Sequence, residues 1–441
     1  MRVMLIDTEN LGLDFALRCV ADGHQVRWFR PSTTPIRDGE GFPGITVVTD
    51  WRKTMSWVGK AGLVFLTGNA KYLRELDRYR EFGWHIFGPT EASADLEIIR
   101  SKGMEAMKAA GINVPPYETF DSLEAAEQFA RKSDRAWVFK PLGDTEDKAL
   151  TYVSHDPADL CGWLQRRIKA GQKVKSCMLQ EKIDMLCELG VSGWFGPEGF
   201  LPDRWQIAFE YKKLMPGDIG PNTGEQGTVT QYVTSDKLAS ECLLPMAGVL
   251  GAMGHRGDFA VGVGIDKSGR EWPFEFTARA GWPAFMNQIA THKGDVAQWM
   301  MDLLNGKDSL KVSQDVCLSV VCGQPPYPAN NGPAALCEGN PIVIPEDAWD
   351  DTHPCSVMLQ RGPVMAGDKV VIGPSYQTTG PYVLVATGTG KTVKAAQKSV
   401  YDTVKEIRFP NMMYRNDIGS SLEKKLPALH KFGYAKDMEF E

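Results

Sequence analysis

The chain has 441 residues, of which 43% are hydrophobic and 24% are charged, and its formal net charge is −6 at pH 7. This length exceeds what one hydrophobic core usually serves, so we expect two to four domains, and the negative charge argues against nonspecific binding to nucleic acid or membranes. No apolar run reaches about 18 residues and the N-terminus lacks a secretory pattern, which predicts a cytoplasmic protein.

Residues 1 to about 90 alternate short apolar runs with helical stretches. This alternation is typical of a small doubly wound parallel sheet. The turn after the first run, Asp7 to Gly12, lacks the glycine fingerprint of dinucleotide-binding domains, so the sheet is not predicted to bind NAD. The predicted strands are 3–6, 26–29, 45–48, 63–66 and 84–87, and the predicted helices are near 12–22 and 70–82.

The sequence after about residue 90 predicts a large mixed sheet, and a third region of strands and a helix follows after about residue 315. A helical pair at about 92–110 and 122–132 comes first. Strands are then predicted at 136–140, 150–153, 177–183, 188–195, 205–211, 229–233, 259–265 and 272–277, and after about 315 at 317–322, 341–344, 369–372 and 382–386, with a helix at 392–406. We therefore expect three domains, at 1–90, 91–314 and 315–441.

The segment from Lys212 to Gly227 is the most informative part of the sequence. It reads Lys-Lys-Leu-Met-Pro-Gly-Asp-Ile-Gly-Pro-Asn-Thr-Gly-Glu-Gln-Gly, and its glycines and prolines exclude a helix or a central strand. It can form a tight loop whose backbone NH groups face an anion, with Asp218, Asn222 and Thr223 as polar side chains. A solvated surface loop is the alternative for such a composition.

Lys140 ends an apolar strand and precedes a glycine-containing loop at 141–149. A lysine at a strand end that faces a flexible loop suits contact with the phosphates of a nucleotide. The alternative is an ordinary lysine whose stem packs on apolar surface while its charge reaches water. The loop also carries Asp144, Glu146 and Asp147, which would repel a triphosphate unless they point away from it or meet magnesium.

A late strand places three polar side chains on one face. Side chains alternate along a strand, so Glu275, Thr277 and Arg279 point the same way. A carboxylate and a second oxygen two residues apart can bind one hard cation, and an arginine beside them can lie over a transferring phosphoryl group. An ion pair between Glu275 and Arg279 at the sheet edge is the alternative.

The run from Ala386 to Thr392 imitates a nucleotide-binding Walker loop. Val385 stands where that pattern requires glycine, which argues against a phosphate site. The run is instead predicted to cap the helix that begins near Thr392.

The residues between Gly217 and Gly227 resemble the Gly-Asp-x-Gly-Pro-Asn-Thr-Gly-Gly-Met-Gly signature of the phosphoribosylamine–glycine ligases, ATP-grasp enzymes of purine synthesis. Other segments resemble the same family, in the same order along nearly the whole chain. They are Phe87–Ala92, Leu96-Glu97, Ser101-Lys102, Lys140–Lys148, Met178–Asp184, Glu275–Pro283, Gly323–Pro328 and Arg415–Gly419. The resemblance implies an ATP-grasp fold of the α/β and α+β classes, with an N-terminal doubly wound parallel-sheet domain and a C-terminal mixed α/β domain.

The resemblance also implies an ATP-dependent ligase that joins a carboxylate to an amine through an acyl phosphate, with ATP and Mg²⁺ (or Mn²⁺) as cofactors. The implied nucleotide contacts are Lys102, Lys140, Gly143, Glu181, Ile183 and Glu188. The implied substrate contacts are Lys212, Asp218, Asn222, Thr223 and Gly224. The implied catalytic residues are Arg279 and Lys148, and the implied metal ligands are Glu275 and Thr277.

The sequence departs from the family pattern at two places near the substrate. In the family, a glycine-rich turn after the first strand helps to hold the ribosyl phosphate, but residues 10–16 here lack its arginine and histidine. Trp282, Ala284 and Phe285 replace an acid, a second acid and a threonine, and Thr277 replaces the metal-binding asparagine. These departures favour a changed pocket and a second substrate other than phosphoribosylamine.

Three hypotheses follow. Phosphoribosylamine–glycine ligation is favoured by the intact Gly-Pro-Asn-Thr-Gly run. A divergent ligase with another amine or acid is favoured by the departures, and a non-catalytic nucleotide-binding or structural protein is favoured by the acidic stretch at 144–147. The expected partners are small molecules (glycine or another carboxylate, and an amine), without nucleic acid or membrane, and the chain is expected as a monomer or small homo-oligomer.

Overall fold

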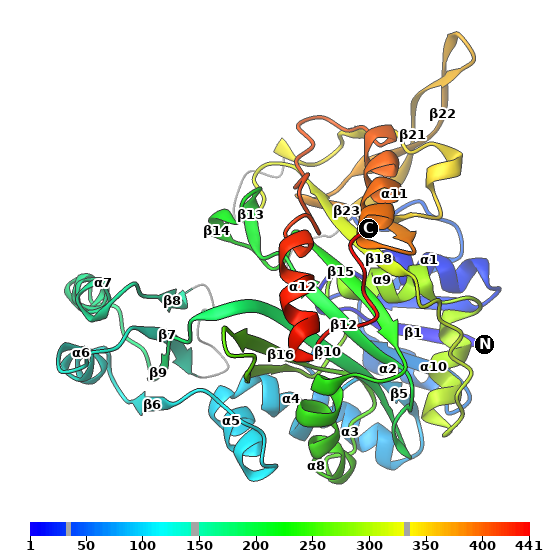
Figure 1. Cartoon of the computed structure of the whole chain (residues 1–441). Helices are drawn as coiled ribbons and strands as arrows, with labels where there is room; N and C mark the ends of the chain where they lie inside the picture. Colours follow the sequence, from blue (N-terminus) through cyan, green and yellow to red (C-terminus); the bar gives the residue numbers. More distant parts are fainter. Residues whose placement is uncertain (32–36, 143–149, 330–335) are drawn as a thin grey trace.

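The N-terminal part of the chain forms a parallel sheet covered by helices (Figure 1). The computed structural model describes residues 1–31, 37–142, 150–329 and 336–441. The strand order is β3-β2-β1-β4-β5, with parallel pairings, which confirms the predicted doubly wound sheet. The elements are β1 (Arg2–Ile6), α1 (Leu13–Ala21), β2 (Gln25–Phe29), β3 (Ile45–Val48), α2 (Trp51–Val58), β4 (Leu63–Leu66), α3 (Leu73–Glu81) and β5 (His85–Phe87).

A small antiparallel sheet with two covering helices projects from the main body and lies at the left of Figure 1. Its strand order is β6-β9-β7-β8. Helices α6 and α7 pack on it around a separate apolar cluster that includes Phe139, Leu160 and Leu179. Helices α4 (Glu91–Ile98) and α5 (Arg100–Ala109) precede this sheet in the chain. The small sheet and its helices consist of β6 (Tyr117–Phe120), α6 (Leu123–Arg131), β7 (Trp137–Leu142), β8 (Tyr152–Val153), α7 (Pro157–Lys169) and β9 (Ser176–Glu181).

The largest sheet runs through the centre of the molecule in the order β17-β16-β10-β12-β15-β18-β23-β20, with β11 paired to β10. Its pairings among the described strands are antiparallel, so the expectation of a mixed sheet is corrected. The strands are β10 (Met185–Gly196), β11 (Gly199–Phe200), β12 (Trp205–Glu210), β15 (Gly227–Val233), β16 (Gly257–Asp266), β17 (Glu271–Thr277), β18 (Val316–Gly323), β20 (Thr352–Pro354) and β23 (Tyr382–Gly390).

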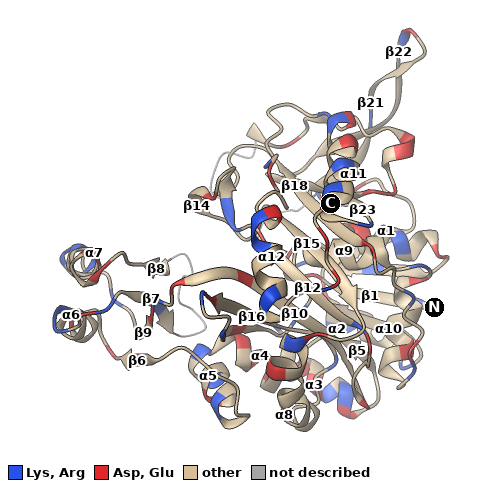
Figure 2. Ribbon diagram, in the orientation of Figure 1, with Lys and Arg blue, Asp and Glu red and all other residues tan. Residues whose placement is uncertain are grey.

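This sheet crosses the domain boundary that the sequence predicts at 314 and 315. Strand β15 pairs with β18, so that Thr228 lies opposite Ser319 and the two predicted domains share one hydrogen-bonded layer. Charged residues are carried mainly by the helices and loops around the sheet, as Figure 2 shows. The central strands are buried because helices cover them; β15 and β18 are buried along their whole length.

The remaining elements lie around this sheet. Thr392 caps α11 by accepting a hydrogen bond from the Ala395 amide at 3.2 Å, which confirms the predicted cap. No helix in the described ranges is both long and apolar enough to span a membrane. The elements are β13 (Lys213–Met215), β14 (Ile219–Asn222), η2 (Ala239–Leu243), η3 (Leu244–Met246), α8 (Ala247–Ala252), α9 (Ala284–Thr291), α10 (Val296–Leu304), β19 (Pro341–Ile342), η5 (Glu346–Ala348), β21 (Val357–Ala366), β22 (Lys369–Thr378), α11 (Val393–Glu406) and α12 (Leu422–Phe432).

The N-terminal sheet and the large sheet share one hydrophobic core. The ring of Phe65 in β4 lies 5.3 Å from that of Phe285 in α9, and the ring of Phe87 lies 5.9 Å from that of Trp194 in β10. Packed aromatic pairs of this kind bury large apolar areas and hold the two layers in one arrangement. The loop after β1 and the end of β17, which carries Glu275, Phe276 and Thr277, line the same cavity.

Candidate active site

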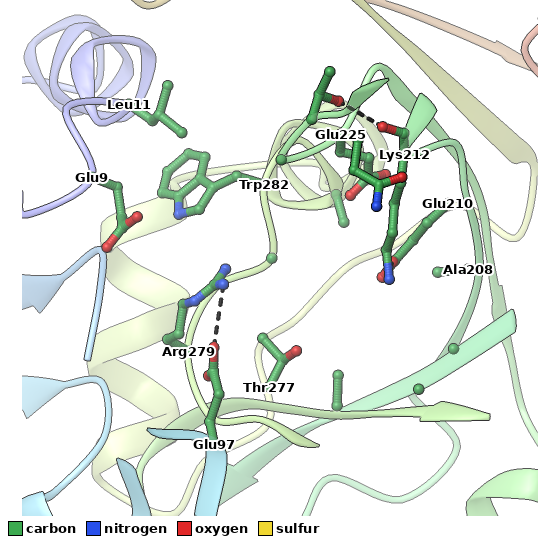
Figure 3. A pocket seen from close by; sticks show the side chains of 18 of the residues that line it. Glu9, Leu11, Glu97, Ala208, Glu210, Lys212, Glu225, Thr277, Arg279 and Trp282 are labelled. Atoms are coloured by element: carbon green, nitrogen blue, oxygen red, sulfur yellow. Dashed lines mark hydrogen bonds and ion pairs between the residues drawn. The ribbon is translucent and has the colours of Figure 1, made fainter. Parts of the chain in front are cut away.

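A cavity of about 1630 Å³ opens where these layers meet. It is lined by the loop after β1, by α4 and α5, by strands of the large sheet and by segments near residues 326–329 and 379–382. Figure 3 shows the Glu97–Arg279 ion pair on one side of the pocket and Glu210, Lys212 and Glu225 on the other. Pockets that join several layers and carry a few charged groups are typical of ligand sites.

Lys140, on β7 of the small sheet, lies behind Phe274 at the edge of this cavity and is not itself among the lining residues. Its side chain is buried, and its Nζ lies 5.4 Å from the centre of the Phe274 ring, which lines the cavity. Burial, and then the nearby Arg100, lowers the pKa of Lys140 to about 8, whereas Glu275 and Glu188 act in the opposite direction. A bound polyphosphate would stabilise the protonated ammonium, so this buried lysine fits ATP.

Glu275 faces the same cleft from β17 and is contacted by two cations. Its carboxylate lies 3.4 Å from Arg100 Nη1 and 3.6 Å from Lys212 Nζ, and that lysine also lies 2.9 Å from Glu210. The pKa of Lys212 is raised, chiefly by the charge of Glu210 and then, against desolvation, by Glu275. We call the group of Lys140, Arg100, Lys212 and Glu275 the nucleotide end of the cavity.

The predicted metal ligands lie on one wall. Glu275 and Thr277 both line the cavity, as strand alternation predicts. Carboxylate and hydroxyl oxygens are suitable donors for Mg²⁺, so the pair fits this ion. Within the described ranges no group of three or more His, Cys, Asp or Glu side chains is placed to hold a metal. Phosphate and water oxygens would therefore complete the coordination, as Mg²⁺ commonly requires.

The structure brings Arg100, rather than Lys102, to the cavity. Lys102 is exposed and its Nζ lies 2.6 Å from the carboxylate of Asp95, outside the cavity lining. The two basic residues are two positions apart on α5, and residues at that spacing point to different sides of a helix. Relative to the family pattern, Ser101-Lys102 stands two residues further from Leu96-Glu97. This offset is the signal from which Arg100 could have been found.

Of the other predicted nucleotide contacts, one lines the cavity, two lie outside its lining and one lies outside the described residues. Glu188 on β10 lines the cavity. Glu181 ends β9, forms an ion pair with Arg135 at 2.7 Å and donates its backbone NH to Pro116, while Ile183 lies half-buried outside the lining. Gly143 and Lys148, with the acidic stretch 144–147, lie outside the described residues.

The glycine-rich segment 212–227, which is predicted to contact the substrate, turns beside the cavity. Asn222, Thr223 and Gly224 line it, and Thr223 donates both its backbone NH and its hydroxyl to the carbonyl of Lys212, at 2.8 and 2.9 Å. The segment includes the short pair β13–β14, which is exposed at its tip rather than part of a central sheet. Asp218 is not among the lining residues, because its carboxylate is paired with Arg415 at 2.8 Å.

Arg279 lies just beyond β17 and is held by carboxylates from the N-terminal half. Its Nη2 lies 3.3 Å from Glu97, which also accepts hydrogen bonds from Asn69 at 2.7 Å and from the Ala278 amide at 2.8 Å. Burial raises the pKa of Glu9, and the positive charge of Arg279 opposes that rise. These contacts join positions about 180 and 270 residues apart, so spacing along the sequence could not reveal them.

Solved structures show the same fold, which is the ATP-grasp fold. The phosphoribosylamine–glycine ligase of Thermotoga maritima matches with a TM-score of 0.69 at 20% identity and covers 95% of this chain and 100% of its own. The biotin carboxylase of Campylobacter jejuni in its β,γ-ATP complex matches with a TM-score of 0.60 at 13% identity, covering 98% and 97%.

Residues 317–421 match the family described as Phosphoribosylglycinamide synthetase, C domain. The phosphoribosylamine–glycine ligase of Ralstonia nicotianae is 27% identical over 359 residues, which cover 78% of this chain and 80% of that protein. The same-named protein of Halalkalibacterium halodurans is 26% identical over 372 residues, with 82% of each covered. Over most of its length the chain is therefore similar in sequence to proteins named phosphoribosylamine–glycine ligase, as its sequence motifs predict.

Proposed function

We propose that the chain is an ATP-dependent ligase that joins a carboxylate to an amine. The observation that carries this proposal is the position of Lys140, which packs against the Phe274 ring next to Glu275, at the edge of a cavity lined by Glu275, Arg100 and Lys212. Relatives that carry the name phosphoribosylamine–glycine ligase support the same reaction class. The ATP-grasp fold supports the use of ATP.

The reaction takes place in two steps. In the first step, a carboxylate oxygen of the acid attacks the γ-phosphorus of ATP, the bond to the β,γ-bridging oxygen breaks, and ADP leaves. In the second step, the amine nitrogen attacks the carbonyl carbon of the acyl phosphate, loses a proton, and phosphate leaves as the amide forms. Both steps require mainly positioning and neutralisation of negative charge.

The side chains of the nucleotide end have the charges that these steps need. Lys140 and Arg100 would bind phosphate oxygens, and Glu275 with Thr277 would hold Mg²⁺. A bound Mg²⁺ supplies further neutralisation of the β- and γ-phosphates. Arg279 would stabilise the charge on the acyl phosphate, with Glu97 fixing the direction of its guanidinium.

Phosphate release, measured with Mg·ATP and a panel of acids and amines, tests the proposal. Phosphoribosylamine with glycine is one pair in this panel, and unphosphorylated amines with glycine and other acids are the rest. We expect at least one pair to accelerate phosphate release in step with amide formation. Separately, Mg·ATP at about 100 times its Kd should stabilise the fold by about 2.7 kcal/mol.

The outcomes separate the hypotheses. Absence of a thermal shift with Mg·ATP would contradict the ligase and favour a structural protein. A shift without turnover of any pair would contradict it in favour of a nucleotide-binding sensor. Turnover with phosphoribosylamine and glycine alone would identify the reaction with that of the relatives, and turnover only with another pair would identify a divergent ligase.

A further inference from the structure

The hairpin of β21 and β22 projects from the body of the molecule, at the upper right of Figure 1. Its two strands pair along their whole length. On the other side of β22, β19 pairs only with Tyr376 and Gln377. In the part of the chain that the structure describes, residues 369–373 of β22 therefore have β21 on one side and no strand on the other.

The projecting part of the hairpin exposes apolar side chains. Met365, Val370 and Ile372 are 65%, 69% and 60% exposed, and Val371 is 41% exposed. Side chains alternate along a strand, so Val370 and Ile372 lie on one face of the hairpin and Val371 lies on the other. A two-stranded hairpin with apolar residues on both faces is unfavourable in water, and an exposed apolar patch of this kind marks an interaction surface.

The backbone groups on the outer edge of β22 can be identified from the base of the strand. The Thr378 NH donates to the Asn340 carbonyl at 2.9 Å, outside the hairpin. In an antiparallel pair, successive residues direct their NH and carbonyl groups to alternate sides. Val370 and Ile372 lie an even number of residues from Thr378, so their NH and carbonyl groups also point away from β21 and are free to pair with another strand.

The edge of β21 is closed, in contrast to that of β22. The Leu359 NH donates to the Glu40 carbonyl at 2.8 Å, so the loop at 39–41 occupies the base of this edge. Nearer the tip, an outward position is taken by Pro363, which has no NH to donate. Proline on an edge strand prevents a further strand from pairing. Only the edge of β22 can therefore be extended near the tip.

The open edge of β22 is complementary to itself. When two copies pair antiparallel about a two-fold axis at Val371, Val370 of each copy lies opposite Ile372 of the other. Both residues have outward NH and carbonyl groups, which they exchange in this register. The same axis places the two Val371 side chains opposite each other on the other face, where branched side chains pack well.

The charges of the hairpin are complementary in the same register. Asp368, in the turn, lies opposite Pro374 of the other copy. Arg361 is the register partner of Pro374, and its guanidinium reaches the Ile372 carbonyl at 3.4 Å, on the outer edge of β22. Asp368 of one copy therefore comes within reach of Arg361 of the other. Within one hairpin, about 17 Å of strand separates Arg361 from the turn, which is too far for an ion pair.

We propose that the chain forms a homodimer in which the outer edges of β22 pair antiparallel around a two-fold axis at Val371. The occupant of the edge is thus a second copy of this chain. Each copy contributes a strand of about five residues, so the interface is small and its Kd should be micromolar. The proposal concerns association alone and does not depend on the ligase activity.

Sedimentation velocity of the full chain, at concentrations up to about 100 µM, tests this proposal. We expect an equilibrium between monomer and dimer. Val370→Pro removes an outward NH and places a ring at the interface, so it should raise the Kd of the dimer about 30-fold or more. The matched control is Met365→Pro. Met365 is the register partner of Val370, but its NH points to the opposite edge, so this variant should change the Kd by no more than about twofold.

Charge variants provide a second test that does not alter the backbone. Asp368→Lys should raise the Kd about fivefold, because it places like charges together across the interface. Addition of Arg361→Glu should restore the native Kd, since the reversed pair is again complementary. Thermal unfolding shows whether each variant keeps its fold, and the charge variants decide the question if a proline variant does not fold. A monomer at every concentration, equal losses in the two proline variants, or no restoration in the double charge variant would each overturn the proposal.

Discussion

The nucleotide end of the cavity and the end beside the loop after β1 differ in the groups that they present to a negatively charged ligand. At the nucleotide end, Lys140 and Arg100 come from separate elements and surround a carboxylate that can hold a cation. At the other end, beside the loop after β1, the donors at the start of α1 are occupied by Asp7, whose carboxylate accepts hydrogen bonds from the Leu11 and Gly12 NH groups. Any ATP-dependent ligase must neutralise the same triphosphate, whereas the substrate that it activates can differ between ligases. The residues of this cavity agree with that distinction, since the basic groups that could neutralise a triphosphate lie at the nucleotide end.

The largest expected effect lies at the nucleotide end, where two lysines can be compared. Lys140→Met should reduce substrate-stimulated phosphate release by about 100-fold, because a cation directed at developing charge is lost. Lys102→Met should change it by no more than about twofold, because Lys102 forms an exposed ion pair with Asp95. Steady-state phosphate release on both variants measures this. A severe loss in Lys102→Met with a mild loss in Lys140→Met would reverse our assignment.

The dependence of phosphate release on Mg²⁺ concentration should distinguish the contribution of Glu275 from that of Thr277. Glu275→Gln should raise the Mg²⁺ concentration that gives half-maximal phosphate release by about tenfold or more, because a charged ligand is lost. Thr277→Asn should lower that concentration by about threefold, since an amide carbonyl is a better ligand than a hydroxyl. Magnesium titrations of both variants provide the measurement. If neither variant shifts the titration, the metal does not lie at β17.

The nucleotide affinity should depend on pH through Lys140. Its pKa of about 8 in the nucleotide-free protein means that it loses its proton above that pH, while phosphate binds the protonated form. Binding then takes up a proton, so the Kd should rise by up to about tenfold per pH unit above pH 8. Lys140→Arg, which stays charged, should flatten the profile. A native Kd that is constant from pH 7 to about 9.5 would exclude this lysine from the phosphates.

The smallest effects should distinguish residues within the glycine-rich segment. Asn222→Ala should raise the KM of one substrate by about fivefold, which corresponds to the loss of one hydrogen bond of about 1 kcal/mol. Asp218→Asn should change KM by no more than about twofold, because Asp218 is paired with Arg415 outside the cavity. Steady-state kinetics on the two variants compare them directly. Equal losses in both would show that Asp218 moves into the site during turnover.

Strand periodicity predicts most of the sheets to within a few residues. The predicted strands 45–48 and 63–66 coincide with β3 and β4, and the helix predicted at 392–406 is α11. Helices α9 and α10 were not predicted, because they are short and largely apolar, and short apolar runs do not distinguish a helix from a strand. The continuity of the sheet across residue 314 was not predicted either, since strand pairing between distant segments leaves no local signal.

The position of a candidate site residue beside the cavity could be predicted where its motif lies on one strand or one turn. Glu275 and Thr277, or Asn222 to Gly224, reach the cavity because alternation and turn geometry are local properties. Arg100 and the contact of Glu97 with Arg279 were not predictable, because they depend on how α4 and α5 pack against β17. The role of Asp7 required the structure, since a carboxylate in a turn gives no indication of which NH groups it will occupy.

The most direct measurement is a crystal structure of the protein with magnesium and a non-hydrolysable ATP analogue. We predict that Lys140 Nζ contacts a phosphate oxygen and that the metal bridges the same triphosphate to Glu275. A nucleotide bound elsewhere, or one that contacts only one of these two side chains, would contradict the ligase assignment.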